Sequence, residues 1–414
     1  MDIIGPGEFL LLIPLGVIGI WRWSIWLIKK ICALFYSPIP VSDSQTVSTT
    51  YSIIVPVYNE DPAVLKAALN SWRENKPDEI IAVIDFMDKD CIRVFLEFAR
   101  GDPKAKLLVT AKEGKRAALS DGIKQATSEI VALVDSDVIW EPDVAVHCLA
   151  PFRKPKIGGV VARQNCLNPH SVLQKILDIM WDLRNVDEWP SQTALGKALT
   201  CLSGRTAFYR REILLPHLDY FQNEILFGRR KESGDDKCLT RIIQRNGWQS
   251  YYQRTAQIYS TATSKMEVFW KQRVRWSRNS YGSDATGLFK EGWVWKHPYL
   301  AFYMIDRFIS PFTLSLALVI FLLAIIQAHW ITVLVILAWW MISRTIKIIP
   351  HLARRPEDIL IVPAYAGVSF IVAAARIYAM FTVKEQKWIR DRALEAKRQA
   401  AYYEKSRAQF TGQT

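Results

Sequence analysis

Short apolar runs alternate with amphipathic stretches along the middle of the chain, from residue 51 to about residue 260. Four of these runs have the length of a buried β-strand: YSIIVPVY (51–58), EIIAVID (79–85), KLLVT (106–110) and EIVALVD (129–135). The segment DPAVLKAALNSWREN (61–75) separates the first two runs and carries apolar residues at helical spacing. This alternation predicts an α/β domain in which helices flank a mixed, mostly parallel sheet.

Longer apolar segments lie toward both ends of the chain. Four of them have the length and composition of a membrane crossing: residues 9–28, 308–328, 330–349 and 359–381. A buried core helix fits the first segment as well. The last segment contains Pro363 and Gly367, so a full crossing and a re-entrant helix both stay open. Lysines and arginines that follow the first and third segments place the central domain in the cytosol, which predicts a multi-pass protein of the cell membrane.

Composition and the absence of certain motifs narrow the range of possible functions. The 414 residues suffice for two or three domains and carry a net charge of +13. The basic residues flank the membrane segments and no nucleic-acid motif occurs, so we expect no nucleic-acid partner. The six cysteines are widely spaced without a C-x-x-C pair, which disfavours a zinc site or a disulfide framework and suits a reducing cytosol. Neither a dinucleotide-binding motif nor a P-loop occurs.

The fourth apolar run ends in two acids, Asp135 and Asp137. Residues two apart on a strand point to the same side, so both carboxylates are expected to project from the carboxyl end of the strand, where open α/β sheets bind ligands. Two such oxygen ligands suit Mg²⁺ or Mn²⁺, although a strand-end turn without a metal fits the pattern equally well. Lys115 and Arg116 open a predicted helix, where cations and backbone N–H groups can hold phosphate.

Two further motifs follow toward the end of the central region. Asp235 and Asp236 precede a helical stretch, where a carboxylate serves either as a helix cap or as the general base for an acceptor hydroxyl. In KQRVRW, the residues Gln272, Arg275 and Trp276 share one face of a helix. A basic amphipathic helix at a membrane surface has the same pattern.

Taken together, these motifs resemble those of the membrane-embedded, processive family 2 glycosyltransferases. That group includes hyaluronan synthases, type 3 capsular polysaccharide synthases, NodC-like chitin-oligomer synthases and cellulose synthases. The resemblance covers about residues 52–282, and five motifs occur in the family's order: VPVYNE, the strand-end Asp85, EGKR, DSD, and GDD with QRVRW. One motif departs from the pattern. Many relatives end in W-G-T-R, and the nearest match here is the incomplete Trp388-Ile389-Arg390.

The resemblance implies a GT-A fold and a role for each matching residue. Donor contacts are implied for Tyr58, Glu60, Asp85, Lys115, Arg116, Asp135, Gln272 and Arg275. Acceptor contacts are implied for Arg163, Gln164, Gly204, Asp235 and Trp276. Asp135 and Asp137 would hold Mg²⁺ or Mn²⁺, and Asp236 would be the general base. The partners implied are a UDP-sugar donor, a growing polysaccharide and the lipid bilayer.

The function that follows is an inverting, processive UDP-sugar transferase that makes a β-linked polysaccharide and passes it across the membrane. A non-processive transferase that glycosylates a lipid carrier is the alternative, and a non-catalytic membrane protein with a degenerate domain is disfavoured because three motifs are intact. The sugar and the linkage stay open. We expect five parts: an N-terminal anchor (1–40), a GT-A domain (50–262), interface helices (263–300), membrane helices (301–385) and a basic tail (386–414).

Overall fold

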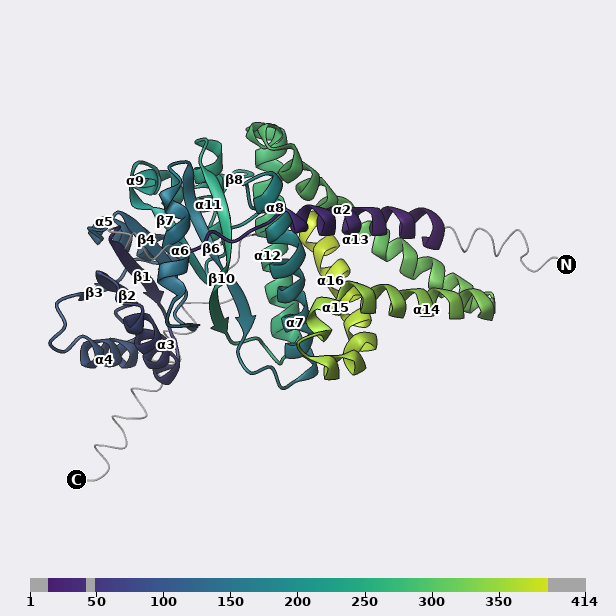
Figure 1. The fold of residues 1–414 in the computed structure, drawn as a ribbon, viewed down its shortest axis with the longest axis horizontal. Helices are drawn as coiled ribbons and strands as arrows, with labels where there is room; N and C mark the ends of the chain where they lie inside the picture. The colour runs from purple at the N-terminus through teal and green to yellow at the C-terminus, as the bar shows by residue number, and fades with distance from the viewer. Residues whose placement is uncertain (1–13, 42–48, 386–414) are drawn as a thin grey trace, which may run out of the picture.

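The computed structural model describes residues 14–41 and 49–385, and it joins a sheet flanked by helices to a group of long helices (Figure 1). The main sheet has the strand order β3-β2-β1-β4-β7-β6-β10-β5, and β8 pairs with β9 separately. The strands are β1 (Tyr51–Val57), β2 (Glu79–Asp85), β3 (Ala105–Thr110), β4 (Ile130–Val134), β5 (Val138–Trp140), β6 (Ile157–Cys166), β7 (Thr206–Arg210), β8 (Ile225–Leu226), β9 (Arg229–Arg230) and β10 (Gln249–Ser260). The four strands predicted from the apolar runs are confirmed as β1 to β4.

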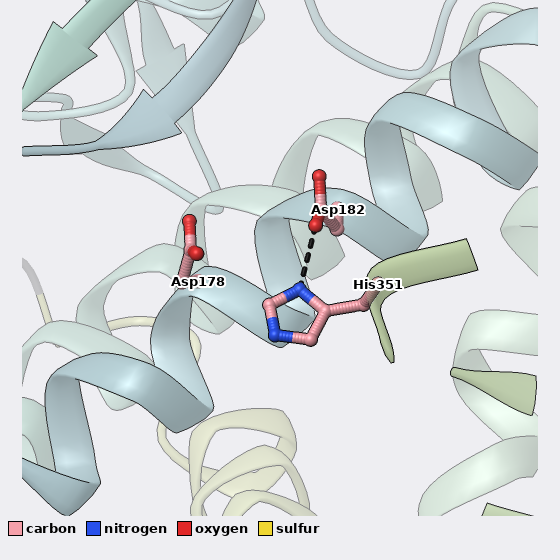
Figure 2. Close-up of side chains that lie close together, drawn as sticks. All are labelled: Asp178, Asp182 and His351. Carbon is pink, nitrogen blue, oxygen red and sulfur yellow. Dashed lines mark hydrogen bonds and ion pairs between the residues drawn. The ribbon is translucent and has the colours of Figure 1, made fainter. Parts of the chain in front are cut away.

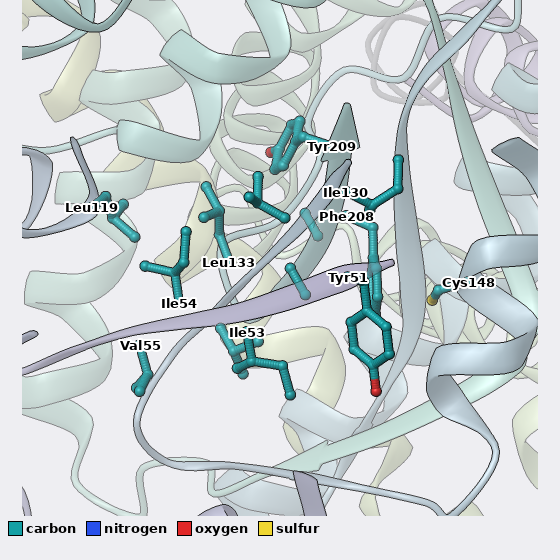
Figure 3. Close-up of a cluster of buried hydrophobic side chains, with 14 of the residues drawn as sticks. Tyr51, Ile53, Ile54, Val55, Leu119, Ile130, Leu133, Cys148, Phe208 and Tyr209 are labelled. Atoms are coloured by element: carbon teal, nitrogen blue, oxygen red, sulfur yellow. The ribbon is translucent and has the colours of Figure 1, made fainter. Parts of the chain in front are cut away.

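Strand directions make the sheet mixed but mostly parallel in its first half. β3, β2, β1 and β4 run parallel to one another. β7 runs antiparallel to both β4 and β6, β6 is parallel to β10, and β5 is antiparallel to β10. The strands β1, β2 and β4 are buried at nearly every position, as expected where helices cover both faces of a parallel sheet. Ile53, Leu133 and Phe208 belong to the resulting core (Figure 3).

Helices flank this sheet and connect its strands. They are α3 (Pro62–Glu74), α4 (Lys89–Phe98), α5 (Lys115–Gln125), α6 (Val144–Leu149), α7 (Val172–Leu183), α8 (Trp189–Leu195), α9 (Arg211–Leu214), α10 (Leu218–Gln222) and α11 (Asp235–Arg245). The helix predicted after β1 is confirmed as α3. It begins there because Asp61 accepts hydrogen bonds from the N–H groups of Ala63 and Val64, while Pro62 takes the first turn.

The two acids of the D-x-D motif lie in a turn. β4 ends at Val134, the N–H of Val138 donates to the carbonyl of Asp135 at 3.3 Å, and β5 starts at Val138. The prediction that Asp135 and Asp137 share one side of an extended strand is therefore wrong. The chain turns here because β5 leaves β4 and pairs antiparallel with β10 at the far edge of the sheet.

Three helical segments in the described residues are long and apolar enough to cross a membrane: Pro298–Ile326 (α13), Trp330–Lys347 (α14) and Pro356–Phe381. The first two follow each other closely and pack together, and α13 begins earlier than the sequence indicated. The third segment joins a 3₁₀ turn to α16 (Val362–Phe381) as one continuous helical segment. Pro363 does not break it, because a proline in the first turn of a helix lacks only an N–H that has no helical partner.

Two other helices lie beside this group (Figure 1). α2 (Ile20–Leu34) contains the second half of the predicted N-terminal segment, while residues 9–13 lie outside the described residues. It is tied to α13 through ion pairs of Arg22 and Lys29 with Asp306. α12 (Met266–Ala285) packs against α16 and carries the QRVRW motif. The basic tail and the Trp388-Ile389-Arg390 match fall outside the described residues.

Candidate active site

Lys115 joins two of the predicted motifs. It is the first residue of α5, after Gly114, whose φ of +94° is a conformation that glycine adopts readily. Its Nζ lies 2.5 Å from Asp135 Oδ1 and 3.1 Å from Asp235 Oδ2. A Cβ at Gly204 would lie 3.4 Å from both Lys115 Nζ and Asp235 Oδ2, so a glycine there keeps this space open. The D-x-D turn, the start of α5 and the start of α11 therefore meet at one point.

The D-x-D turn has the charge pattern of a cation site. Burial and the neighbouring charge of Asp135 raise the pKa of Asp137 to about 6. Among the residues that the structure describes, no ion pair neutralises Asp137. A divalent cation would relieve this crowding of negative charge, and two carboxylates with room for phosphate oxygens form a donor set that suits Mg²⁺ or Mn²⁺. The residues present therefore fit the predicted metal.

Asp235 and Asp236 open α11 and differ in their electrostatics. Burial opposes the ionisation of Asp235, but Lys115 and Arg116 hold its pKa below the ordinary value. Burial and the charge of Asp235 raise the pKa of Asp236. The carboxylate of Asp236 accepts hydrogen bonds from the N–H of Lys237 at 2.8 Å and from the thiol of Cys201 at 3.3 Å. A raised pKa suits a group that must accept a proton.

The predicted donor residues after β1 and β2 lie at the carboxyl ends of these strands, beside the D-x-D turn. Ser136 donates to Oε2 of Glu60 at 2.6 Å, which brings the loop after β1 against the turn. Asp85 is buried at the end of β2 and accepts the N–H of Met87 at 3.0 Å. Tyr58 follows β1 directly. β1 pairs in parallel with both β2 and β4, so the carboxyl ends of the three strands share one edge of the sheet.

Arg116 points into the protein. Its guanidinium donates to the carbonyls of Phe221, Ser233 and Gly234 at 2.9 to 3.1 Å and pairs with Glu224 at 2.7 Å. Only 5% of its side chain is exposed. Arg116 is thus placed to hold the loop that precedes Asp235 and Asp236, while its neighbour Lys115 faces the site.

The QRVRW motif lies on α12, as predicted, with Gln272, Arg275 and Trp276 partly exposed on one face. Arg205 connects Trp276 with the D-x-D turn. Its guanidinium lies 5.9 Å from the ring centre of Trp276, and its backbone carbonyl accepts the N–H of Asp135 at 3.2 Å. The charges of Asp137 and Asp135 act on the Arg205 guanidinium, while burial lowers its pKa.

Arg163 and Gln164 of β6 hold other arginines and acids in place. Arg163 pairs with Asp182 at 3.2 Å. Oε1 of the buried Gln164 accepts hydrogen bonds from Arg184 at 2.5 Å and from Arg205 at 3.1 Å. Arg163 and the Oε1 atom of Gln164 therefore have protein partners, whereas the buried Nε2 atom of Gln164 has none among the described residues. Arg184 and Arg205 were not predicted as site residues, although Arg205 directly follows the predicted Gly204.

A second group of metal-ligating side chains lies between the second half of α7 and the short helix α15 (Ile349–Leu352). Asp178, Asp182 and His351 each place a ligand atom within 4.8 Å of the others, a spacing that could hold a metal ion (Figure 2). His351 Nδ1 lies 2.6 Å from Asp182, and Arg354 also pairs with Asp182. Arg355 pairs with Asp178 at 3.5 Å. Protein cations already neutralise these acids, and the group ties α7 to the segment between α14 and α16.

The sequence matches one protein family, and its relatives are glycosyltransferases. The sequence model described as "Glycosyltransferase like family 2" matches residues 49–279. The chain is 25% identical over 398 residues to an N-acetylglucosaminyltransferase of Rhizobium meliloti, with 90% of each chain covered. It is 24% identical over 385 residues to a hyaluronan synthase of Streptococcus pyogenes, again with 90% of each covered. A type 2 glycosyltransferase of Pyricularia oryzae is 28% identical over 392 residues, which are 88% of this chain and 77% of that protein.

A solved structure shares the fold. The mannosyltransferase of Pyrobaculum calidifontis, determined in complex with GDP-Man and Mn²⁺, superposes with a TM-score of 0.60 at 18% sequence identity. The match covers 92% of this chain and 99% of that protein. The predicted fold class, a GT-A-like mixed sheet with flanking helices and further apolar helices, is therefore confirmed.

Proposed function

The chain belongs to glycosyltransferase family 2, and on that premise we propose that this enzyme is an inverting UDP-sugar transferase that extends a β-linked polysaccharide processively. The observation that carries this proposal is the position of Lys115, which pairs with Asp135 of the D-x-D turn and with Asp235 beside Asp236. A donor bound at the turn and an acceptor bound at α11 would meet at this lysine. The relative named hyaluronan synthase supports the processive reading.

In this proposal Asp236 is the general base. Its carboxylate takes the proton of the acceptor hydroxyl while that oxygen forms a bond to the anomeric carbon and the bond to the diphosphate oxygen breaks. The raised pKa of Asp236, caused by burial and by the charge of Asp235, makes its carboxylate a better proton acceptor than an exposed aspartate. Attack from the face opposite the leaving group converts an α-linked donor into a β-linkage.

Several side chains would offset the charge that develops on the leaving diphosphate. Asp135 and Asp137 would hold Mg²⁺ or Mn²⁺, which supplies positive charge to the phosphate oxygens when bound. Lys115 would exchange a carboxylate for a phosphate oxygen, and Arg275 would approach from α12. Trp276, on the same face of α12, would give the acceptor sugar a flat apolar surface.

The three membrane-capable helices support export of the product across the bilayer. We propose that the sheet domain lies in the cytosol, because Arg344 and Lys347 lie in the last turn of α14. Transfer of a single sugar to a lipid carrier uses the same donor chemistry and is the alternative. Size-exclusion chromatography of the product separates the two, since one yields a long polymer and the other a glycolipid.

The test uses the purified full chain with Mn²⁺ or Mg²⁺ and each UDP-sugar, alone and in pairs, with UDP release as the readout. We expect metal-dependent release, abolished by chelation, and a loss of about 10²–10⁴-fold in Asp236→Asn because a general base contributes about that much. Asp90→Asn, in an exposed i,i+3 ion pair on α4, is the matched control. Full turnover by Asp236→Asn would contradict the proposed role.

A further inference from the structure

Arginines from four separate segments gather between the candidate active site and α16. Arg184 follows α7, Arg205 precedes β7, Arg273 lies on α12 and Arg376 lies on α16. Arg184 and Arg205 share Gln164 Oε1 as their hydrogen-bond acceptor. The charges of the other three arginines all act on Arg273. We call these four residues the arginine cluster.

Two arginines of the cluster lie beside Trp276, the proposed acceptor platform. The guanidinium groups of Arg205 and Arg273 lie 5.9 and 5.0 Å from the ring centre of Trp276. Arg205 also lies 4.2 Å from the ring centre of Trp181. Each arginine of the cluster keeps part of its side chain exposed. The cations therefore stand beside the surface on which an acceptor sugar would rest.

The charge of the cluster is only partly compensated by the protein: Asp137 and Asp135 act on Arg205 without forming an ion pair. In residues 14–41 and 49–385, no ion pair joins any of its four arginines to a carboxylate. Buried nitrogen atoms of Arg184 and Arg273 lack a hydrogen-bond partner. Burial and the neighbouring arginines lower the pKa of Arg273 to about 9. Glu188 offsets part of this charge at Arg184 and Arg376. Like charges that lie close together with restricted access to water repel one another, so a bound anion would stabilise this arrangement.

The position of the cluster favours the acceptor over the donor. Arg205 faces the acids of the active site, whereas Arg376 belongs to one of the membrane-capable helices. The cluster therefore extends from the site of transfer toward the helices, which is the direction that a growing chain would take. The donor diphosphate would instead lie at the D-x-D turn and Lys115.

We propose that the arginine cluster binds an oxyanion carried by the acceptor. This inference rests on the proposed transferase function, because it assumes that an acceptor occupies Trp276. The oxyanion chemistry has two sources, the carboxylate of a uronic acid and the phosphate of a polyprenyl carrier. Guanidinium groups recognise both through charge-assisted hydrogen bonds.

The test measures binding to the detergent-purified full chain by titration calorimetry. Three probes are used: an oligosaccharide of alternating glucuronate and N-acetylglucosamine, the same oligosaccharide with its carboxylates reduced to alcohols, and undecaprenyl phosphate. We expect the acidic sugar to bind about tenfold or more tightly than its reduced form, the equivalent of about 1.4 kcal/mol. Arg273→Gln and Arg376→Gln should each remove much of this difference, and Arg273→Lys should restore part of it.

Controls distinguish a specific loss of anion binding from a general loss of folding. Arg93→Gln removes an equal charge from α4, where the side chain is 70% exposed, and should change nothing. Unchanged UDP binding shows that Arg273→Gln and Arg376→Gln are folded. If only undecaprenyl phosphate binds tightly, and Arg273→Gln abolishes this binding, the cluster binds an oxyanion as proposed and the oxyanion belongs to a lipid carrier. Equal binding of the acidic and reduced sugars, with no binding of the lipid phosphate, would overturn the inference.

UDP release is measured separately. If UDP is released with a neutral acceptor and the arginine variants behave like Arg93→Gln, the arginine-cluster inference fails and the transferase function stands. If no UDP-sugar is turned over at all, the proposed function fails instead. The wild-type comparison of the two oligosaccharides needs no variant, so poor folding of one variant leaves the inference testable.

Discussion

Replacing Lys115 with alanine should damage sugar transfer far more than folding. The ammonium group of Lys115 pairs with Asp135 at 2.5 Å and with Asp235 at 3.1 Å. Its removal leaves one carboxylate on each side of the site without a shared cation. The pKa of Asp235, which Lys115 holds down against the effect of burial, should rise. The donor half and the acceptor half of the site would then no longer be joined by ion pairs to the same ammonium group.

The exposure of the partners sets the expected magnitude. Breaking a fully buried ion pair costs about 3–5 kcal/mol. The side chains of Lys115 and Asp135 are 21% and 33% exposed, and water screens part of their interaction, so we expect about 1–2 kcal/mol of destabilisation. Loss of a positive group facing a developing negative charge costs about 10²–10³-fold in kcat. The variant should therefore stay folded and turn over very slowly.

The assay compares UDP release at saturating metal with thermal unfolding of the same preparation. Lys112→Ala is the control, because Lys112 lies on the loop before α5, is 64% exposed and pairs with Asp121 at 2.8 Å. An exposed pair of this kind contributes about 0–1 kcal/mol. Equal kcat for Lys115→Ala and Lys112→Ala would refute the idea that Lys115 joins the two halves of the site.

Other predictions concern pH, stability and positioning. The transfer rate should fall as pH drops through the raised pKa of Asp236, because the base must be ionised, and Asp235→Asn should move this limb of the pH–rate profile to lower pH. Despite burial, hydrogen bonds from Lys106 and nearby hydroxyls lower the pKa of Glu79 to about 2. Glu79 therefore stabilises the fold above pH 4.5 and loses this effect as pH falls toward 2. Glu79→Gln should cost about 2 kcal/mol in denaturant unfolding at neutral pH, and the cost should shrink in acid. Arg116→Lys should lower kcat and leave KM for the donor unchanged. If Arg116 contacted the nucleotide instead, the same substitution would raise KM.

Local sequence was sufficient for the strands and helices that carry the site. β1, β2 and β4 are continuous apolar runs because both faces of each strand are covered, and such runs are visible without any knowledge of their neighbours. The helical face of the QRVRW motif follows from its spacing alone. Both kinds of inference depend mainly on residues within one element.

Features that depend on distant partners were not visible in the same way. The conformation of the D-x-D turn is set by β5, which pairs with β10, and Trp140 meets Ile258 across that pair. The arginine cluster is assembled from four segments, and each arginine alone has the pattern of an ordinary surface residue. The sequence indicated a basic loop at Lys115 and Arg116 but gave no direction for either side chain.

The different surroundings of Lys115 and Arg116 connect the fold with the proposed chemistry. Successive residues of a helix point about 100° apart, so one side chain at the start of α5 can face the site while the next faces the core. Lys115 pairs with Asp135 and Asp235. Arg116 holds the carbonyl groups just before Asp235 and is itself held by Glu224. A single turn of helix thus contacts the proposed metal ligands through one side chain and positions the proposed base through the other. For this reason we expect the two residues to have different roles, with Lys115 contacting the donor and Arg116 acting through the position and charge of Asp235 and Asp236.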